Sequence, residues 1–176
     1  MNLFLIGYRG SGKTTVAAAL AERLGWPWID ADVELERRAG RSIREIFELE
    51  GERGFRDRES AILTELAGKN GCIVALGGGA VLREENREQT NGRGLVVWLR
   101  ASPEALLERI SADPTTAARR PNLTAQGGLD EIRGLLAQRE HLYAAWADLE
   151  VDAEGQSPDQ IAESICTQLR LEGHTP

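Results

Sequence analysis

A short stretch near the start of the chain, NLFLIGYRGSGKTT at residues 2–15, restricts the fold more than any other feature of the sequence. An apolar run that predicts a buried strand is followed by a glycine-rich turn and the start of a helix. Gly7 to Thr14 match the pattern G-x-x-x-x-G-K-[ST], in which backbone N–H groups and the positive end of a helix dipole surround phosphate oxygens. The stretch therefore predicts a P-loop nucleotide-binding protein.

The residues of this loop have distinct predicted roles in binding ATP. Lys13 is expected to reach the β- and γ-phosphates and to be catalytic, because it would stabilise charge on the transferring phosphate. The Thr14 hydroxyl is a predicted ligand of Mg²⁺, the expected cofactor. The predicted ATP-binding residues of the loop are Gly10, Ser11, Gly12, Lys13, Thr14 and Thr15. A P-loop alone does not separate kinases from GTPases or ATP-driven machines, but the small chain favours a small phosphotransferase.

Short apolar runs alternate with longer helical patterns along the chain. The runs are NLFLI (2–6), WPWI (26–29), CIVAL (72–76), LVVWL (95–99) and LEVDA (149–153). Such runs are typical of strands buried on both faces, and their alternation with helices indicates an α/β fold. We expect five parallel strands flanked by helices in one domain, 1–176. Ser42, Ser102 and Ser157 precede helical patterns and predict where three helices begin.

Composition argues against several classes of function. A net charge of −7 disfavours a general nucleic-acid binder or a protein that docks on acidic membranes. No apolar run approaches the ~18 residues that span a bilayer, and the first residues lack the charged leader of a signal peptide. Cys72 and Cys166 stand far apart and there are only two histidines, so neither a zinc site nor a disulfide scaffold is expected. We therefore expect a cytoplasmic protein with reduced cysteines.

Acidic and glycine residues follow two of the predicted strands, where ligands gather in open α/β sheets. Asp30 and Asp32 follow the second strand, and on an extended segment both would point the same way. One or both could hold Mg²⁺-bound water or accept a proton from an attacking hydroxyl. The alternative is that one of them only caps the next helix. The glycines at 77–79 would either offer bare backbone to a ligand or form a flexible turn.

A charged pair interrupts one predicted helix face. In GFRDRESAIL (54–63), Glu59 lies on the apolar stripe of Phe55 and Ile62, and Arg56 is its neighbour one turn away. The first interpretation is a surface ion pair at the margin of the stripe. The second is that the edge of this helix is a ligand site, in which Glu59 holds Arg56 in place.

A second charge on an apolar face favours the ligand site. In the predicted helix 129–147, Arg139 takes the stripe position between Leu136 and Tyr143. A buried charge needs a partner or a ligand. Arg56 and Arg139 facing one cavity would suit a planar anion such as a carboxylate, bound by two parallel hydrogen bonds.

The least patterned stretch is ADPTTAARRPNLTAQGG at 112–128, with two prolines and two adjacent arginines. A loop of this length inside a compact domain is often a lid or a binding loop. The alternative is a disordered surface loop.

Together these motifs resemble the shikimate kinase family over about residues 3–167. The matching segments are GYRGSGKTT, IDADVELERRAGRSIREIFELEGERGFRDRE, LGGGAV, RRPNL and QREHLYAAWADLEVD. The resemblance implies ATP-dependent phosphorylation of the 3-hydroxyl of shikimate, on the way to chorismate and the aromatic amino acids. It also implies a three-layer sandwich like that of nucleoside monophosphate kinases, with a core, a substrate-binding region over about 31–60 and a lid over about 110–125.

The resemblance also implies roles for single residues. Asp32 would be the catalytic acceptor of the hydroxyl proton, and Asp30 would lie in the outer shell of Mg²⁺. Arg120, in the lid, would be catalytic by closing over the transferring phosphate, and Arg109 would lie near the adenine, so both would bind ATP. The residues implied to bind shikimate are Asp32, Arg56, Gly78, Gly79 and Arg139, with Glu59 behind Arg56.

The sequence departs from the family pattern in two places. Arg9 occupies a P-loop position where related sequences often carry a small or apolar residue or proline. DAEGQSP (152–158) lacks the basic residue that some relatives place beside the adenine. Competing interpretations are another small-molecule P-loop kinase, such as a gluconate kinase-like or nucleoside monophosphate kinase, and a nucleotide-dependent regulator without activity. The expected partners are shikimate and ATP, with no nucleic acid and no membrane, and the expected state is a monomer.

Overall fold

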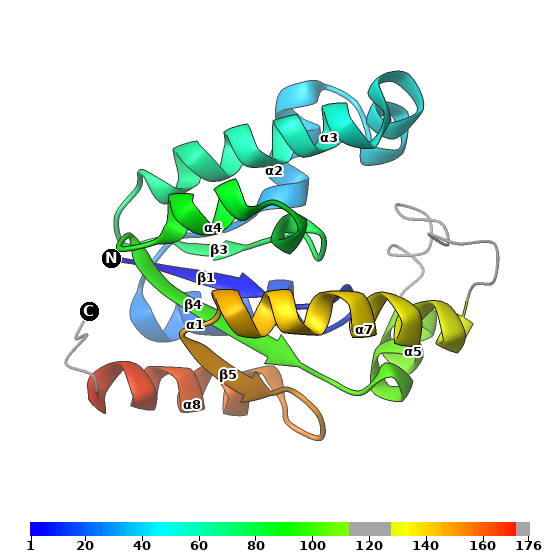
Figure 1. Cartoon of the computed structure of the whole chain (residues 1–176). Helices are drawn as coiled ribbons and strands as arrows, with labels where there is room; N and C mark the ends of the chain where they lie inside the picture. The colour runs from blue at the N-terminus through cyan, green and yellow to red at the C-terminus, as the bar shows by residue number, and fades with distance from the viewer. Residues whose placement is uncertain (113–127, 172–176) are drawn as a thin grey trace.

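The computed structural model describes residues 1–112 and 128–171 (Figure 1). The strands are β1 (Asn2–Ile6), β2 (Trp28–Asp30), β3 (Ile73–Ala75), β4 (Gly94–Arg100) and β5 (Leu149–Asp152). The helices are α1 (Lys13–Leu24), α2 (Ala31–Ala39), α3 (Ile43–Ala67), the 3₁₀ helix η1 (Ala80–Leu82), α4 (Glu84–Thr90), α5 (Pro103–Ala112), α7 (Gly128–Trp146) and α8 (Pro158–Leu171). The five predicted strands are confirmed, with bounds that shift by two residues or fewer.

The strands form one parallel sheet in the order β2-β3-β1-β4-β5. β1 lies at its centre, where Leu3 is level with Ile73 of β3 and Leu95 of β4. Because all five strands run the same way, their carboxyl ends meet at one edge. The P-loop follows β1 and therefore lies in the middle of that edge, between the segments that follow β3 and β4.

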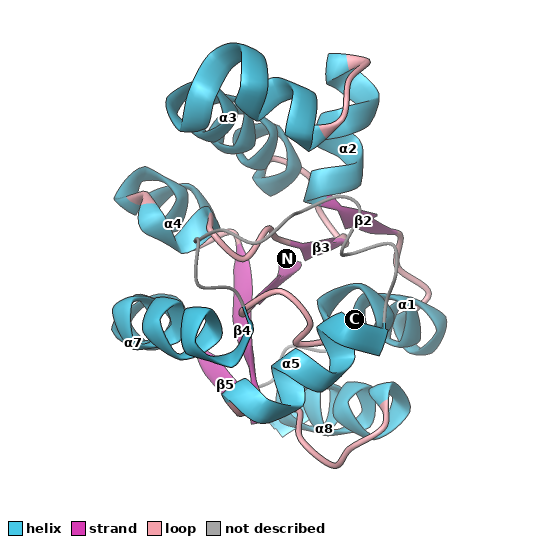
Figure 2. Ribbon diagram, turned by 90° about the vertical axis from the view of Figure 1, so that its right-hand side faces the viewer, coloured by secondary structure: helices cyan, strands magenta, loops and turns pink. Residues whose placement is uncertain are grey.

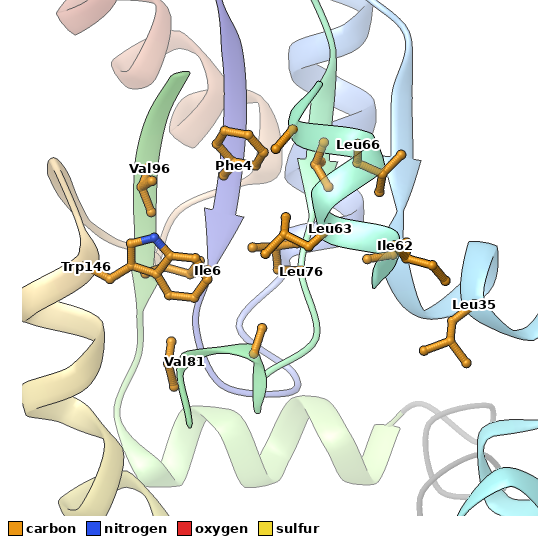
Figure 3. Close-up of a cluster of buried hydrophobic side chains, with 14 of the residues drawn as sticks. Phe4, Ile6, Leu35, Ile62, Leu63, Leu66, Leu76, Val81, Val96 and Trp146 are labelled. Carbon is orange, nitrogen blue, oxygen red and sulfur yellow. The ribbon is translucent and has the colours of Figure 1, made fainter. Parts of the chain in front are cut away.

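Helices cover both faces of the sheet (Figure 2). Successive residues of β1 point to opposite faces, so Phe4 and Ile6 join one core cluster whereas Leu3 and Leu5 join the other. Helices α3 and α7 contribute to the first cluster, and Figure 3 shows Phe4 and Ile6 there with Leu63, Leu66 and Trp146. The second cluster is closed by α1 and α8. The predicted three-layer α/β/α sandwich is confirmed.

The predicted helix starts are capped as their sequences suggest. Ser42 and Glu45 form a complete capping box at the start of α3. The Ser102 hydroxyl accepts a hydrogen bond from the Ala105 N–H, and the Ser157 hydroxyl accepts one from the Gln160 N–H. These caps satisfy N–H groups that a helix cannot pair internally, and so they fix where each helix begins.

Helix α3 contains a kink that the periodicity does not reveal. Gly51 has φ 68° and ψ −176°, which is not helical, so the chain turns between a short first part and the long second part that carries Arg56 and Glu59. The Phe47 and Phe55 rings stack across the kink with centroids 4.6 Å apart. Within the described ranges, no helix is long and apolar enough to cross a membrane.

Candidate active site

The P-loop closes between the end of β1 and the start of α1. Gly7 is needed there because a β-carbon would lie 2.5 Å from the Leu99 carbonyl oxygen of β4. Gly12 is the N-cap of α1 in the left-handed region, with φ 93°, and no side chain of the described residues caps this helix. The first N–H groups of α1 are therefore left for phosphate oxygens, as predicted for this turn.

Lys13 is held against the loop by the loop's own backbone. Its Nζ donates to the carbonyl oxygens of Gly7 at 2.9 Å and Tyr8 at 2.8 Å. The buried Ser11 hydroxyl lies 3.5 Å from the same nitrogen, and the Thr15 hydroxyl donates to the Gly12 carbonyl at 2.9 Å. A positive charge is thus fixed at the P-loop.

The end of β2 reaches the P-loop through Asp30. The Thr14 hydroxyl donates to Asp30 Oδ2 at 2.8 Å, and Asp30 Oδ1 accepts from the backbone N–H groups of Asp32 and Val33. Asp30 is therefore the N-cap of α2, whereas Asp32 lies inside its first turn. The expectation that both aspartates lie on one extended segment is wrong, because the Asp30 cap starts the helix immediately after β2.

The Thr14 and Asp30 oxygens form a donor set that fits Mg²⁺. This ion takes hard oxygen ligands and keeps several waters, so one hydroxyl and one nearby carboxylate beside phosphates suffice. Among the described residues there is no cluster of three or more His, Cys, Asp or Glu side chains that could hold a metal by itself. A cation here would therefore depend on phosphate oxygens for the rest of its ligands.

Arg56 lies on the long part of α3 in a fixed environment. Its Nη1 lies 2.7 Å from Glu59 Oε2, and the two side chains are 12% and 5% exposed. Its guanidinium carbon lies 5.0 Å from the centre of the Phe55 ring. A β-carbon on Gly79 would collide with the Arg56 guanidinium. The predicted neighbours Arg56 and Glu59 are thus in contact, with Glu59 buried and Arg56 largely covered, which excludes the surface ion-pair interpretation.

Arg139 is half-buried on α7, at the stripe position that the sequence indicates. Between described residues, no carboxylate lies within ion-pair distance of its guanidinium. Burial raises the pKa of the Tyr143 hydroxyl, and the charges of Arg139 and Arg56 act to lower this pKa. Both arginines therefore lie near one phenol group, although they come from different helices.

The glycines at 77–79 are buried. The Tyr143 hydroxyl donates to the Gly78 carbonyl at 2.6 Å, which ties α7 to this turn. A β-carbon on Gly78 would lie 3.2 Å from the backbone nitrogen of Arg9 and 3.3 Å from the Gly7 carbonyl oxygen. The turn therefore packs its bare backbone between the P-loop, α7 and the Arg56 guanidinium.

One residue predicted to bind ATP, Arg109, lies towards the other end of the edge. Arg109 of α5 donates from Nη2 to the Ala153 carbonyl at 2.5 Å, so it meets the segment 152–158 that follows β5. Arg120 lies outside the described residues, as does most of the predicted lid at 110–125.

One contact at this edge was not predicted. Arg9 Nη2 lies 3.1 Å from Glu131 Oε1, which is in the first turn of α7. Arg9 stands out in the sequence, but nothing local indicates a partner 122 positions away. A signal was present in α7, because Glu131, Leu135 and Arg139 are spaced by four residues and lie along one side of a helix.

Comparisons with known proteins agree with this geometry. The family model described as shikimate kinase matches residues 9–170. A shikimate kinase of Rhodopirellula baltica is 46% identical over 164 residues, which are 93% of this chain and 88% of the relative. The solved structure of shikimate kinase from Acinetobacter baumannii in complex with shikimate is 38% identical, with a TM-score of 0.90 over 99% of this chain and 95% of that chain.

More distant structures share the fold alone. A gluconokinase from Sinorhizobium meliloti is 18% identical, with a TM-score of 0.56 over 98% of this chain and 97% of that chain. This likeness shows a shared fold alone, and it gives no support to the gluconate kinase-like interpretation of the sequence.

Proposed function

The chain belongs to the shikimate kinase family and is a phosphotransferase that acts on shikimate with ATP; we propose that it transfers the γ-phosphate to the 3-hydroxyl at the edge described above. The products are shikimate 3-phosphate and ADP, on the way to chorismate and the aromatic amino acids. The observation that carries the proposal is the arginine pair, in which Arg56 is paired with Glu59 and Arg139 has no carboxylate partner among the described residues.

The charges around the arginines match one carboxylate. Arg56 is paired with the buried Glu59 and with the exposed Glu52. The half-buried Arg139 has no carboxylate partner among the described residues, so its positive charge is available for the acceptor's single negative charge. Each guanidinium offers a rigid fork of N–H donors, and two forks hold a planar carboxylate by its shape as well as its charge. Gly79 supports this arrangement because it lets the Arg56 guanidinium lie directly against the backbone.

The acidic and basic side chains at the P-loop supply the chemistry. Asp32 accepts the proton of the acceptor hydroxyl as its oxygen bonds to the γ-phosphorus, and the bond from that phosphorus to the oxygen shared with ADP breaks. Lys13 binds the phosphates and stabilises the charge that moves onto ADP. Arg120 stays a predicted catalytic residue outside the described ranges.

Mg²⁺ is the proposed cofactor, with Thr14 as a direct ligand and Asp30 as a ligand through water. When bound, the ion neutralises charge on the phosphates. The 2.8 Å contact between the two side chains supports this assignment, because it places both oxygens beside the P-loop.

The remaining parts of the proposal concern the chain as a whole. We assign the nucleotide base to the neighbourhood of Arg109 and segment 152–158, whose contact at Ala153 brings these two parts together. The chain is proposed to be one cytoplasmic, monomeric kinase domain, with a core, a substrate-binding region over about 31–60 and a lid over about 110–125.

The arginine clamp is tested by changing protein and ligand together. Arg139→Lys keeps the charge but loses the fork, so we expect shikimate binding to weaken by roughly 1–3 kcal/mol, measured by calorimetry. Wild type should also bind the neutral amide of shikimate far more weakly than shikimate. Arg139→Ala should lose most of this discrimination, because the amide removes the charge that Arg139 recognises.

The affinity for ADP serves as the control, because the nucleotide contacts other elements. It should change little in either variant. Equal binding of shikimate and its amide to wild type would show that the arginines serve the fold or the nucleotide instead of the acceptor.

A further inference from the structure

The buried ion pair between Arg9 and Glu131 joins two elements that are far apart in the sequence. The two side chains are 11% and 0% exposed. Between described residues only the Arg56–Glu59 pair is comparably buried, since every other pair has at least one side chain that is 32% exposed or more. Removing charges from water is costly, so a pair of this kind has to be matched in geometry to be tolerated.

Besides its packing and its Arg133–Glu104 pair with α5, helix α7 is held by three polar contacts with other elements. Towards its C-terminal end, Trp146 Nε1 donates to the Thr90 hydroxyl at 2.7 Å. The Tyr143 hydroxyl donates to Gly78 at 2.6 Å. The third contact is the Arg9–Glu131 pair in the first turn, so the helix is held at both ends.

Arg139 lies between these attachments, eight residues after Glu131 and four before Tyr143. With 3.6 residues per turn, Arg139 lies about 12 Å from Glu131 along the helix axis and about 80° from it around the axis, so both side chains can face Tyr8. The N-terminal half of α7 also packs on α5, where Ile132 shares a buried cluster with Leu106 and Tyr8. The Arg9–Glu131 contact ties this half to the P-loop, and it therefore contributes to where Arg139 lies relative to the P-loop.

The surroundings of Tyr8 show that these groups form one cluster. Burial raises the pKa of the Tyr8 hydroxyl, the charges of Arg9 and Arg139 act to lower it, and the charge of Glu131 acts to raise it. The Tyr8 ring also packs with Ile132 in a small separate core cluster. The P-loop backbone and the first turn of α7 are thus joined by apolar packing as well as by the ion pair.

We propose that Arg9 and Glu131 are positioning residues for Arg139: their ion pair fixes the first turns of α7 against the P-loop and so aims the Arg139 fork at the acceptor carboxylate. Two parallel hydrogen bonds tolerate little rotation, so a small movement of the helix lowers affinity. The inference rests on the proposed function, in which Arg139 binds that carboxylate. In this proposal Arg9 affects shikimate binding by positioning α7, and not by contacting the phosphates of the nucleotide.

The test measures the Kd of shikimate by calorimetry in Glu131→Gln, Arg139→Lys and the double variant. Glu131→Gln should raise the Kd about 10-fold, because α7 loses its ion pair with the P-loop. In the Arg139→Lys background, Glu131→Gln should raise the Kd less than 2-fold, because the guanidinium whose orientation the ion pair fixes is no longer present. Additive effects would overturn the inference, because a merely structural role lowers affinity in both backgrounds.

A second measurement separates the ion pair from direct contact with the ligand. The exchanged variant, Arg9→Glu with Glu131→Arg, should recover most of the lost affinity, whereas an Arg9 that touches shikimate itself would not be replaced in this way. If the exchanged variant does not fold, Arg9→Met with Glu131→Gln should equal Glu131→Gln alone within 3-fold. A much larger loss would overturn the inference.

A neighbouring ion pair provides the matched control. Arg133 Nη2 of α7 lies 2.5 Å from Glu104 Oε1 of α5, and both side chains are more than half exposed. Glu104→Gln should leave the Kd of shikimate unchanged within 2-fold, and a loss like that of Glu131→Gln would overturn the specific role of Arg9. If Arg139→Lys itself has no effect, the clamp of the proposed function fails; if only Glu131→Gln has none, the clamp stands and this inference fails.

Discussion

At the scale of single residues, the proposed binding of the acceptor carboxylate depends on the neighbours of Arg56 and Arg139. Arg56 is enclosed by a carboxylate, an aromatic ring and a glycine, through Glu59, Phe55 and Gly79. Arg139 has a buried phenol nearby and no carboxylate partner among the described residues. One cation is therefore braced and neutralised, and the other is left for the acceptor carboxylate of the proposed function.

Gly79→Ala should lower the affinity for shikimate while it changes the stability of the fold little. Its backbone, with φ −101° and ψ 0°, accepts alanine, but the new methyl group collides with the Arg56 guanidinium. The end of a flexible side chain can move away, so we expect the free energy of unfolding to change by less than about 1 kcal/mol. The displaced Arg56 should weaken shikimate binding by about 1–3 kcal/mol, measured by calorimetry.

The Kd of ADP should stay the same in Gly79→Ala, which shows that the P-loop is intact. Unchanged shikimate affinity in this variant would mean that Arg56 does not need its present position to bind the acceptor.

At the scale of elements, the kink in α3 decides how its arginine-bearing part lies on the sheet. Glu50 and Arg58 form two hydrogen bonds across the kink, at 2.8 and 2.9 Å, and Phe47 stacks on Phe55. These contacts hold the angle between the two parts, but Gly51 makes the turn possible. Its φ and ψ lie in a region that residues with a side chain rarely adopt.

Gly51→Ala should therefore destabilise the protein by about 1–3 kcal/mol in urea unfolding, although its β-carbon would meet no atom within 4 Å. The loss would arise in the backbone alone. Gly134 of α7 is the matched control, since a β-carbon there also meets no atom within 4 Å and its φ is helical.

Gly134→Ala should stabilise the protein by up to about 1 kcal/mol, because alanine loses less backbone freedom in a helix. Equal effects of the two substitutions would show that the conformation of Gly51 carries no strain for alanine.

At the scale of the whole molecule, a parallel sheet gathers residues from distant parts of the chain at one edge. The P-loop after β1, Asp30 at the end of β2 and the glycine turn after β3 meet there, and α7 crosses beside them. The stability of this assembly also depends on surface charge, because helices α2 and α3 are joined by an ion-pair network. Glu34 accepts hydrogen bonds from Arg37 and Arg38, and Arg38 donates to Glu65 of α3 at 2.6 Å.

Acid unfolding should reveal this network. The hydrogen bonds from Arg37 and Arg38 lower the pKa of Glu34 from its ordinary 4.5 to about 2. Because the pKa is lower in the folded protein, the stabilising contribution is complete above about pH 4.5 and is lost as the pH falls towards 2. Glu34→Gln should lower the free energy of unfolding at pH 7 by less than about 1 kcal/mol, since the pair is near the surface.

The difference between wild type and Glu34→Gln should shrink between pH 4.5 and pH 2 in urea titrations. A difference that stays constant down to pH 2 would show that the ionised Glu34 carboxylate does not stabilise the folded state.

The sequence by itself determined the parts that depend on local patterns. The P-loop, the five strands and the capping serines follow from residue spacings of a few positions, so they are readable without the fold. The contact of Arg56 with Glu59 is of this kind, because residues three apart on a helix are neighbours wherever the helix lies. The buried position of Glu59 and the half-buried position of Arg139 follow in the same way from the apolar stripes that they interrupt.

The tertiary structure alone decided which distant groups meet. Local pattern favours an aspartate cap after β2, but only the position of α2 beside the P-loop made Asp30 both the cap and the partner of Thr14. Arg9 and Glu131 are 122 positions apart. Periodicity tells which face of a helix is buried, whereas the partner of a buried charge depends on how helices pack on the sheet, and this packing is set by the whole core at once.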